Sequence, residues 1–234
     1  DKDDDKDAGD KADNGGGDDD SDSAAAALMV VWRKPPVPAN EDARRAALCQ
    51  YDILDTEPEE AYDRITALCR RLFRCPVALL TFIDKDRVWF KSAAGFGPVQ
   101  GALDRGSGLC AWTLLSRQPA ALVVPDMLAD RRFRDYPVVT GPPHARFYAG
   151  VPLVCPRSGH KLGTLCVVDR VAWPNFSAEE TGLLAQLGAM AMREVDRRRR
   201  TNAARCAASV SGSKLPAPAL LGRPRMAEVE AVTT

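Results

Sequence analysis

The chain has 234 residues, and its 32 basic and 32 acidic side chains give a formal net charge of +0. This length suits one ordinary domain with tails at its ends. The longest apolar run, residues 24–32, is far shorter than the roughly 20 residues that a membrane-spanning helix needs. The residues before it are acidic, unlike those of a signal peptide. We therefore expect a cytoplasmic protein with no membrane partner.

The first 39 residues are expected to form a disordered tail. Residues 1–23 contain eleven aspartates and bury no apolar surface. The Pro-rich stretch 35–38 follows, and it cannot continue a helix. We expect the folded domain to span residues 40–200, with a second disordered tail, rich in Ala, Ser, Pro and Gly, over residues 201–234.

Two helices are predicted at the start of this domain. Asn40 is a candidate N-cap for the first, and Thr56 with Glu59 is a candidate capping box for the second. In the second helix, apolar residues recur at three- and four-residue steps, which predicts one buried face. These residues are Tyr62, Ile65, Leu68, Cys69, Leu72 and Phe73.

Strand-forming segments come next. Residues 77–83 are continuously apolar, as in a central strand covered on both faces, and residues 87–94 alternate in character. A short helix is expected over 107–115 and a short strand over 121–124, before a loop rich in Pro and Gly over 136–143.

Residues 146–169 are predicted to form a β-hairpin. Arg157–His160 supplies turn-forming residues between two segments with the two-residue period of a strand. In the first segment, this period places alternate side chains on opposite faces of the sheet. One face would carry Phe147, Ala149, Val151 and Leu153, and the other Tyr148, Gly150 and Pro152.

A last helix is predicted over 177–200. Ser177 and Glu180 form a second candidate capping box. Its inner face is expected to contain Leu183, Leu184, Leu187, Met190 and Ala191. Four arginines, 197–200, suit the negative end of the helix dipole. No aromatic residues interleave with them, so we expect no nucleic-acid partner.

The order of elements predicts an α+β fold, an antiparallel sheet flanked by helices, with helices at both ends of the domain. Four segments, 44–66, 75–95, 122–139 and the hairpin, resemble in order and spacing the GAF domains at the N-terminus of many histidine kinases and diguanylate cyclases. The resemblance covers about residues 41–196 and implies a GAF-like fold and a small-molecule sensor.

In that family, the ligand lies between one sheet face and the segments that cover it. By position, the cover would be 107–115 and 126–143, and the wall 88–91 with 147–153. Such pockets are mostly apolar with a few polar groups. The expected ligand-binding residues are Trp89, Phe90, Cys110, Trp112, Asp126, Phe133, Arg146 and Tyr148. Core packing remains the alternative for each aromatic residue.

Three sharper functions of GAF domains can be compared with the sequence. A bilin chromophore commonly needs a Cys followed by His, but Ala111 follows Cys110. The Asn-Lys-Phe pattern of cyclic-nucleotide sites is missing. The segment 106–110 resembles that of free methionine-sulfoxide reductases, yet Gln100 stands where an upstream Cys would fall, and the loop 141–146 has no Cys. That enzyme, with Cys110 as nucleophile, stays an alternative.

No other chemistry is indicated. The seven cysteines include no CxxC pair, and Cys155 and Cys166 are expected to serve packing. The sequence lacks a P-loop, a G-x-S-x-G elbow and an H-E-x-x-H helix. We therefore predict no catalytic residues, no metal site and no identifiable cofactor, and leave an unidentified small-molecule ligand open.

These observations favour a regulatory domain of intracellular signal transduction, including phosphorelay. It would couple a ligand to an output domain or signalling partner, such as a kinase or cyclase, by a shift between two packings. The resemblance also implies a homodimer formed through the terminal helices. A GAF scaffold that binds no ligand and serves only dimerisation is the alternative.

Overall fold

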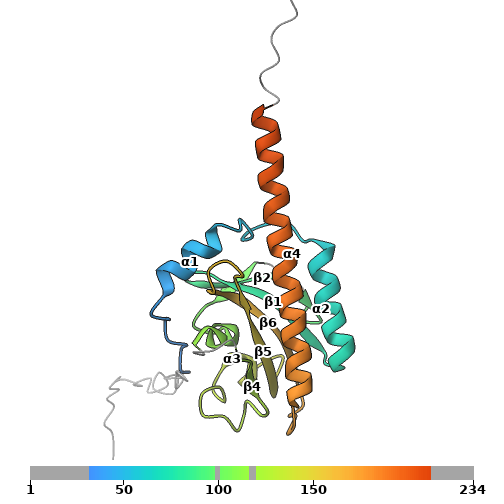
Figure 1. The fold of residues 1–234 in the computed structure, drawn as a ribbon. Helices are drawn as coiled ribbons and strands as arrows, with labels where there is room; N and C mark the ends of the chain where they lie inside the picture. The colour runs from blue at the N-terminus through green and yellow to red at the C-terminus, as the bar shows by residue number, and fades with distance from the viewer. Residues whose placement is uncertain (1–31, 98–100, 116–119, 212–234) are drawn as a thin grey trace, which may run out of the picture. The chain divides into compact units, whose positions relative to one another are not determined.

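A six-stranded sheet lies at the centre of the part of the chain that the computed structural model describes, residues 32–97, 101–115 and 120–211 (Figure 1). The strand order is β3-β2-β1-β6-β5-β4, and all neighbours are antiparallel. The strands are β1 Val77–Ile83, β2 Arg87–Ala94, β3 Ala102–Asp104, β4 Leu122–Val124, β5 Phe147–Val154 and β6 Lys161–Asp169.

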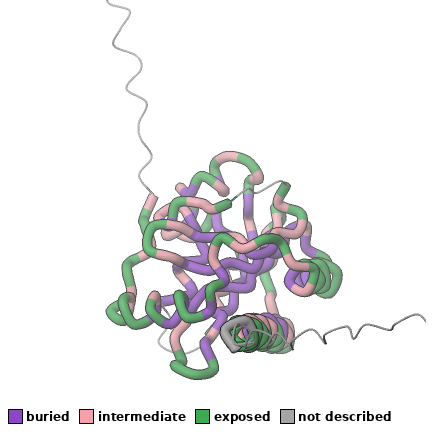
Figure 2. The backbone as a smooth tube through the Cα atoms, turned by 90° about the horizontal axis from the view of Figure 1, so that it is seen from above, coloured by how far each residue is buried: buried purple, intermediate pink, exposed green. Residues whose placement is uncertain are grey.

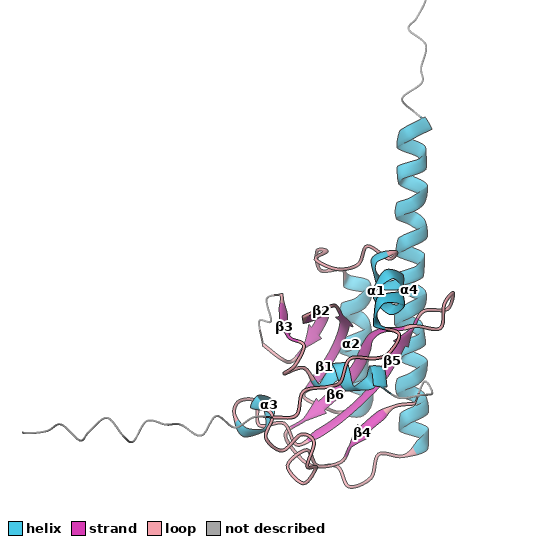
Figure 3. Cartoon of the chain, turned by 90° about the vertical axis from the view of Figure 1, so that its left-hand side faces the viewer, coloured by secondary structure: helices cyan, strands magenta, loops and turns pink. Residues whose placement is uncertain are grey.

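Helices lie on both faces of this sheet (Figure 3). One face carries three α-helices, which are α1 Glu41–Cys49, α2 Glu60–Phe73 and α4 Ala178–Ser211. The other carries the 3₁₀-helix η1, Leu109–Leu115, and the short helix α3, Pro137–Thr140. The expected α+β class, with helices at both ends of the domain, is confirmed.

The predicted hairpin is confirmed as β5 and β6. The pairing runs from Phe147 opposite Asp169 to Val154 opposite Lys161. Successive side chains point to opposite faces, so Phe147 and Ala149 pack against the helices, whereas Tyr148 belongs to the second core, beneath η1 and α3. The alternation seen in the sequence therefore divides the interior into two cores.

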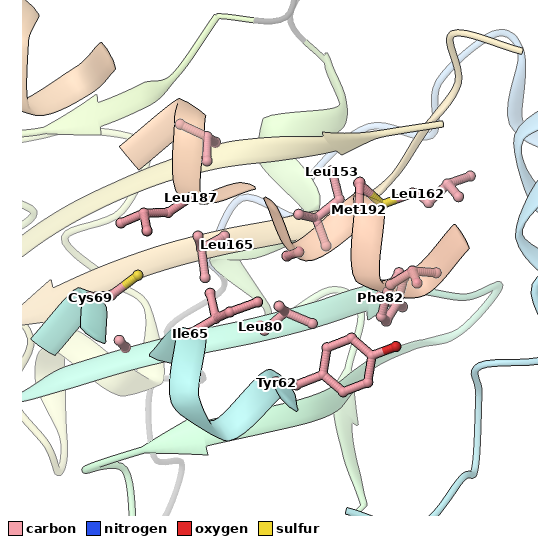
Figure 4. Close-up of a cluster of buried hydrophobic side chains, with 14 of the residues drawn as sticks. Tyr62, Ile65, Cys69, Leu80, Phe82, Leu153, Leu162, Leu165, Leu187 and Met192 are labelled. Carbon is pink, nitrogen blue, oxygen red and sulfur yellow. The ribbon is translucent and has the colours of Figure 1, made fainter. Parts of the chain in front are cut away.

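The first core lies between the sheet and the three α-helices. Leu80 and Phe82 of β1 and Leu165 of β6 face side chains from α2 and α4 (Figure 4). Each of these three residues is fully buried. In Figure 2, buried backbone is concentrated in the sheet, while α4 is exposed along much of its outer side.

The predicted buried faces of α2 and α4 are too wide. Leu68, Leu72 and Met190 are 38%, 47% and 43% exposed. Because a helix turns about 100° per residue, a stripe built from both three- and four-residue steps is broader than the strip that touches a flat sheet. In α4, Met192 and Val195 are buried instead of Met190.

One capping box forms and the other does not. Ser177 Oγ accepts from Glu180 N at 3.1 Å, and Glu180 Oε2 accepts from Ser177 N at 2.7 Å. Thr56 instead donates to the Ile53 carbonyl oxygen at 2.8 Å. Glu59 stands at the N-cap of α2 without a capping bond, because its carboxylate binds Lys91. Asn40 also makes no capping bond.

The boundaries of the domain differ from those expected. Helix α4 does not end at residue 200 but continues to Ser211, beyond the sheet (Figure 1). At the other end, the Trp32 indole donates to the Gly106 carbonyl oxygen at 2.9 Å, so part of the expected N-terminal tail packs on the domain. Residues 1–31 and 212–234 lie outside the described residues. In the described ranges, no helix has the length and apolar character to cross a bilayer.

Candidate ligand site

An apolar cavity lies in the second core, between the sheet and its cover. Phe90 of β2, Leu79 of β1 and Val168 of β6 form the floor, while Cys110 of η1 and Val138 of α3 belong to the cover. The volume is about 40 Å³, and almost all of the lining is apolar. A cavity needs about 10–15 Å³ to hold one water molecule. This space therefore admits a few water-sized groups and nothing as large as a nucleotide.

Three of the expected ligand-binding residues, Phe90, Cys110 and Tyr148, line this cavity. Trp112 and Phe133 belong to the same core but not to the lining. Their rings meet edge to face at 5.4 Å, and the Trp112 indole donates to the Tyr136 hydroxyl at 2.7 Å. These two residues hold the cover together.

The other three expected residues lie elsewhere. Trp89 points to the opposite face of the sheet, where its ring packs 6.4 Å from that of Phe82. Asp126 and Arg146 pair with each other through bonds of 2.7 and 2.8 Å. The hydrogen bond from Arg146 lowers the pKa of Asp126. The pair joins the segment after β4 to the start of β5, and neither residue lines the cavity.

Tyr148 contributes a polar group to this apolar region. The residue is 1% exposed, and its hydroxyl has no hydrogen-bond partner among the described residues. Burial raises its pKa well above the usual value, so the phenol stays protonated. A Cβ atom on Gly150 would overlap the Tyr148 hydroxyl, so glycine is needed there to make room for it.

Beside Tyr148, the structure brings together two cysteines. The Sγ atoms of Cys110 and Cys166 are 3.8 Å apart, although 56 residues separate them in sequence. The hydrogen bond with Cys166 lowers the pKa of Cys110, and the same bond raises the pKa of Cys166. Sequence reasoning assigned Cys166 to packing, because no spacing rule indicates a pair formed across a helix and a strand.

Sequence reasoning also missed part of the lining. Phe96 and Leu103 border the cavity, although they lie outside the segments expected to form its wall and its cover. Phe96 and Leu103 lie on either side of residues 98–100, which include Gln100 and are outside the described residues, and β3 was not predicted. The ring of Phe96 stacks 6.1 Å from Phe90, a contact with no periodic signal in the sequence.

A polar cluster lies behind the cavity wall. A register shift in the β1–β2 pairing sets Leu80 opposite Ser92 but Thr81 opposite Phe90, so Lys91 is the extra residue of a β-bulge. Its ammonium group, on the helix-covered face, donates to Glu59 Oε1 at 2.7 Å. Burial lowers the pKa of Lys91, and the bond to Glu59 opposes that effect.

This cluster extends to α4. Glu59 Oε1 also accepts from Arg198 at 2.8 Å, and Arg198 donates to the Asp52 carbonyl oxygen at 2.7 Å. Burial alone would raise the pKa of Glu59, but Lys91 and Arg198 together lower it. Part of the arginine run therefore anchors α4 to the domain. The described residues contain no group of three or more metal-ligating side chains.

The chain is similar to several known proteins. A cyclic di-GMP phosphodiesterase of Pseudomonas aeruginosa is 33% identical over 168 residues, which are 72% of this chain and 28% of the enzyme, so the chain spans only about a quarter of that relative.

Two solved structures are similar at lower identity. A putative GAF sensor protein from Burkholderia vietnamiensis is 21% identical, with 68% of this chain and 98% of that one covered and a TM-score of 0.48. Free methionine-R-sulfoxide reductase from Neisseria meningitidis is 16% identical, with coverages of 74% and 99% and a TM-score of 0.48.

The family profile named GAF domain matches residues 57–195, more than half of the chain. That range begins just before α2 and ends within α4, so it includes all six strands and the cover of the cavity. The chain therefore belongs to the GAF domain family, a regulatory fold of signalling proteins.

Proposed function

We propose that this domain is a small-molecule sensor that admits its ligand into the apolar cavity and transmits binding through α4 to an output domain such as a kinase or cyclase. The contact path from the cavity to α4 carries the proposal. Phe90 lines the cavity, and the next residue, Lys91, is linked through Glu59 to Arg198 of α4.

The size of the cavity suggests how binding would produce a signal. The present volume is about 40 Å³, whereas a dry cavity that accepts benzene is about 150 Å³. A metabolite must therefore displace the cover, and the open and closed packings become two states that ligand redistributes. Tyr148, with its unpartnered hydroxyl, favours a ligand that combines an apolar body with one polar group.

Thermal denaturation with indole, phenol and hexanoate as probes tests this function. A ligand at a hundredfold excess over its Kd stabilises the folded state by about 2.7 kcal/mol, so at least one probe should raise the melting temperature. Val138→Phe, which fills the half-buried cover side of the cavity, should abolish the shift. Val171→Phe, at a position 65% exposed, is the matched control and should retain it.

The alternatives predict other outcomes. If no probe shifts the melting temperature and native mass spectrometry finds no co-purified small molecule, the sensor function is wrong, and the dimerisation scaffold takes its place. The cysteine pair favours one second candidate, reduction of free methionine sulfoxide with Cys110 as nucleophile. We expect no such turnover; turnover that Cys110→Ala abolishes would establish the enzyme.

A further inference from the structure

Cys110 and Cys166 are held face to face by the packing of η1 on β6. Their Sγ atoms are 3.8 Å apart, so a disulfide bond of about 2.05 Å needs an approach of about 1.8 Å. The Cys110 carbonyl oxygen accepts from Thr113 at 2.7 Å and from Thr164 at 3.0 Å. The Thr113 and Thr164 hydroxyls also lie within hydrogen-bonding distance of each other, so these three groups together hold the helix against the strand.

Among the buried cysteines of the described ranges, the pKa is lowered at Cys110 and at Cys155, but the Cys155 Sγ lies beside the Tyr51 hydroxyl and not beside a second thiol. Cys166 lowers the pKa of Cys110 through their shared hydrogen bond, which favours the nucleophilic thiolate at Cys110. In contrast, burial raises the pKa of Cys69 to about 12 and that of Cys75 to about 11. Within the pair, Cys110 is therefore the expected nucleophile, and the Cys166 Sγ lies beside it at 3.8 Å.

Access to the pair is selective. Cys110 borders the apolar cavity, whose 40 Å³ admits water-sized molecules. Cys166 is fully buried behind it. Hydrogen peroxide is small enough to enter this space, whereas a tripeptide thiol is not. Oxidation at this place should therefore give a bond within the chain and not a mixed disulfide.

We propose that Cys110 and Cys166 form an oxidisable dithiol, a modification site that hydrogen peroxide converts into a disulfide between η1 and β6. The Cys110 thiolate attacks one peroxide oxygen, the O–O bond breaks, and the departing hydroxide takes up the thiol proton as water. Cys166 sulfur then attacks the sulfenic sulfur, the S–O bond breaks, and its proton leaves with the hydroxyl as a second water. This oxidation does not require the domain to bind a sensory ligand.

Peptide mapping of the full chain tests this proposal. Cys49 and Cys206 are exposed, so both are first replaced by serine to remove competing thiols. After peroxide treatment and alkylation of the remaining thiols in denaturant, we expect a linked peptide pair containing Cys110 and Cys166, which dithiothreitol separates. If both residues are recovered as alkylated thiols although peroxide was present in excess, the proposal is wrong.

Variants of the pair define the order of steps. Cys166→Ser should leave Cys110 as a sulfenic acid, which dimedone added together with the denaturant traps, and Cys110→Ser should leave Cys166 reduced. Cys75→Ser, in the other core, is the matched control and should form the bridge like the parent chain. Sulfenic acid appearing at Cys166 in Cys110→Ser would contradict the assigned nucleophile.

A second measurement does not depend on how the variants fold. The bridge would close a loop of 56 residues in the unfolded chain, so the oxidised parent should melt at a higher temperature than the reduced parent. If peroxide treatment left the melting temperature of the parent chain unchanged, no bridge would have formed in the folded protein, contrary to the proposal.

Discussion

At the residue scale, Glu41 balances two buried guanidinium groups. It accepts from Arg44 at 2.7 Å and from Arg105 at 2.6 Å, and the side chains of these arginines are only 1% and 9% exposed. Burial alone would raise the pKa of Glu41, but the hydrogen bonds from Arg44 and Arg105 outweigh it and lower the pKa to about 2. Between about pH 2 and pH 4.5, this carboxylate therefore stays charged in the folded protein, whereas it would be largely protonated in the unfolded chain.

Glu41→Gln should lower the free energy of unfolding at pH 7 by about 3 kcal/mol, because it leaves two buried charges without a counter-ion. A depressed carboxyl pKa stabilises the fold above the unfolded pKa, and this contribution is lost as the pH falls through the folded pKa. The difference between parent and variant should therefore shrink from pH 4.5 towards pH 2. Urea denaturation across this range measures it.

Glu60→Gln is the matched control for this prediction. Glu60 pairs with Arg64, but the two side chains are 77% and 74% exposed, and such surface pairs contribute about 0–1 kcal/mol. If Glu41→Gln lost no more stability than Glu60→Gln at pH 7, the buried ion cluster would not have the importance assigned to it.

At the scale of elements, the capping box of α4 has a measurable effect. Ser177 satisfies the Glu180 backbone N–H at the start of the longest helix in the described ranges. Ser177→Ala should cost about 1 kcal/mol in the free energy of unfolding. Glu179→Gln, in the same first turn, should cost less than about 0.5 kcal/mol, since it affects only the helix dipole. Equal losses in chemical denaturation would rule out the capping bond.

Periodicity predicted the long elements well, for a physical reason. Residues 77–83 are apolar throughout, and residues 146–169 alternate, because their side chains are buried in two separate cores. The central strands could therefore be placed from the sequence. Short elements carry less of this record. The three-residue strand β4 was predicted from its apolar residues, but β3, with three residues, and α3, with four, were not, because neither is long enough to establish a period.

The candidate site was less predictable than the fold. Phe90 and Tyr148 could be assigned to a pocket from their place in the family pattern, but Trp89 adjoins Phe90 and faces the other way. Which of two neighbours points inward depends on strand register, and the bulge at Lys91 alters that register. The contact between Cys110 and Cys166 depends on tertiary packing, which no local pattern records.

At the scale of the whole domain, Glu59 joins three parts of the chain. It lies in the segment that precedes α2, and it binds one residue of β2 and one residue of α4. It binds Lys91, whose side chain is fully buried, and Arg198, whose side chain is 15% exposed. Lys91 also donates to Thr56 Oγ1 at 2.9 Å and to the Glu57 carbonyl oxygen at 2.7 Å. Loss of the Glu59 charge would leave these neutral acceptors, and the bond from Arg198 to the Asp52 carbonyl oxygen, but would remove the ion pairs that join Lys91 to α4.

Glu59→Gln should therefore loosen α4 where it leaves the domain. We expect faster amide hydrogen exchange from Arg198 towards Ser211, with exchange in the sheet-packed part around Leu187 changed much less, because that part is held by the first core. Glu57→Gln is the matched control, since Glu57 contributes its backbone carbonyl to Lys91 and its side chain is not needed for that bond. If both variants exchanged alike along α4, the path from cavity wall to helix would not run through Glu59, and the proposed route of transmission would fail.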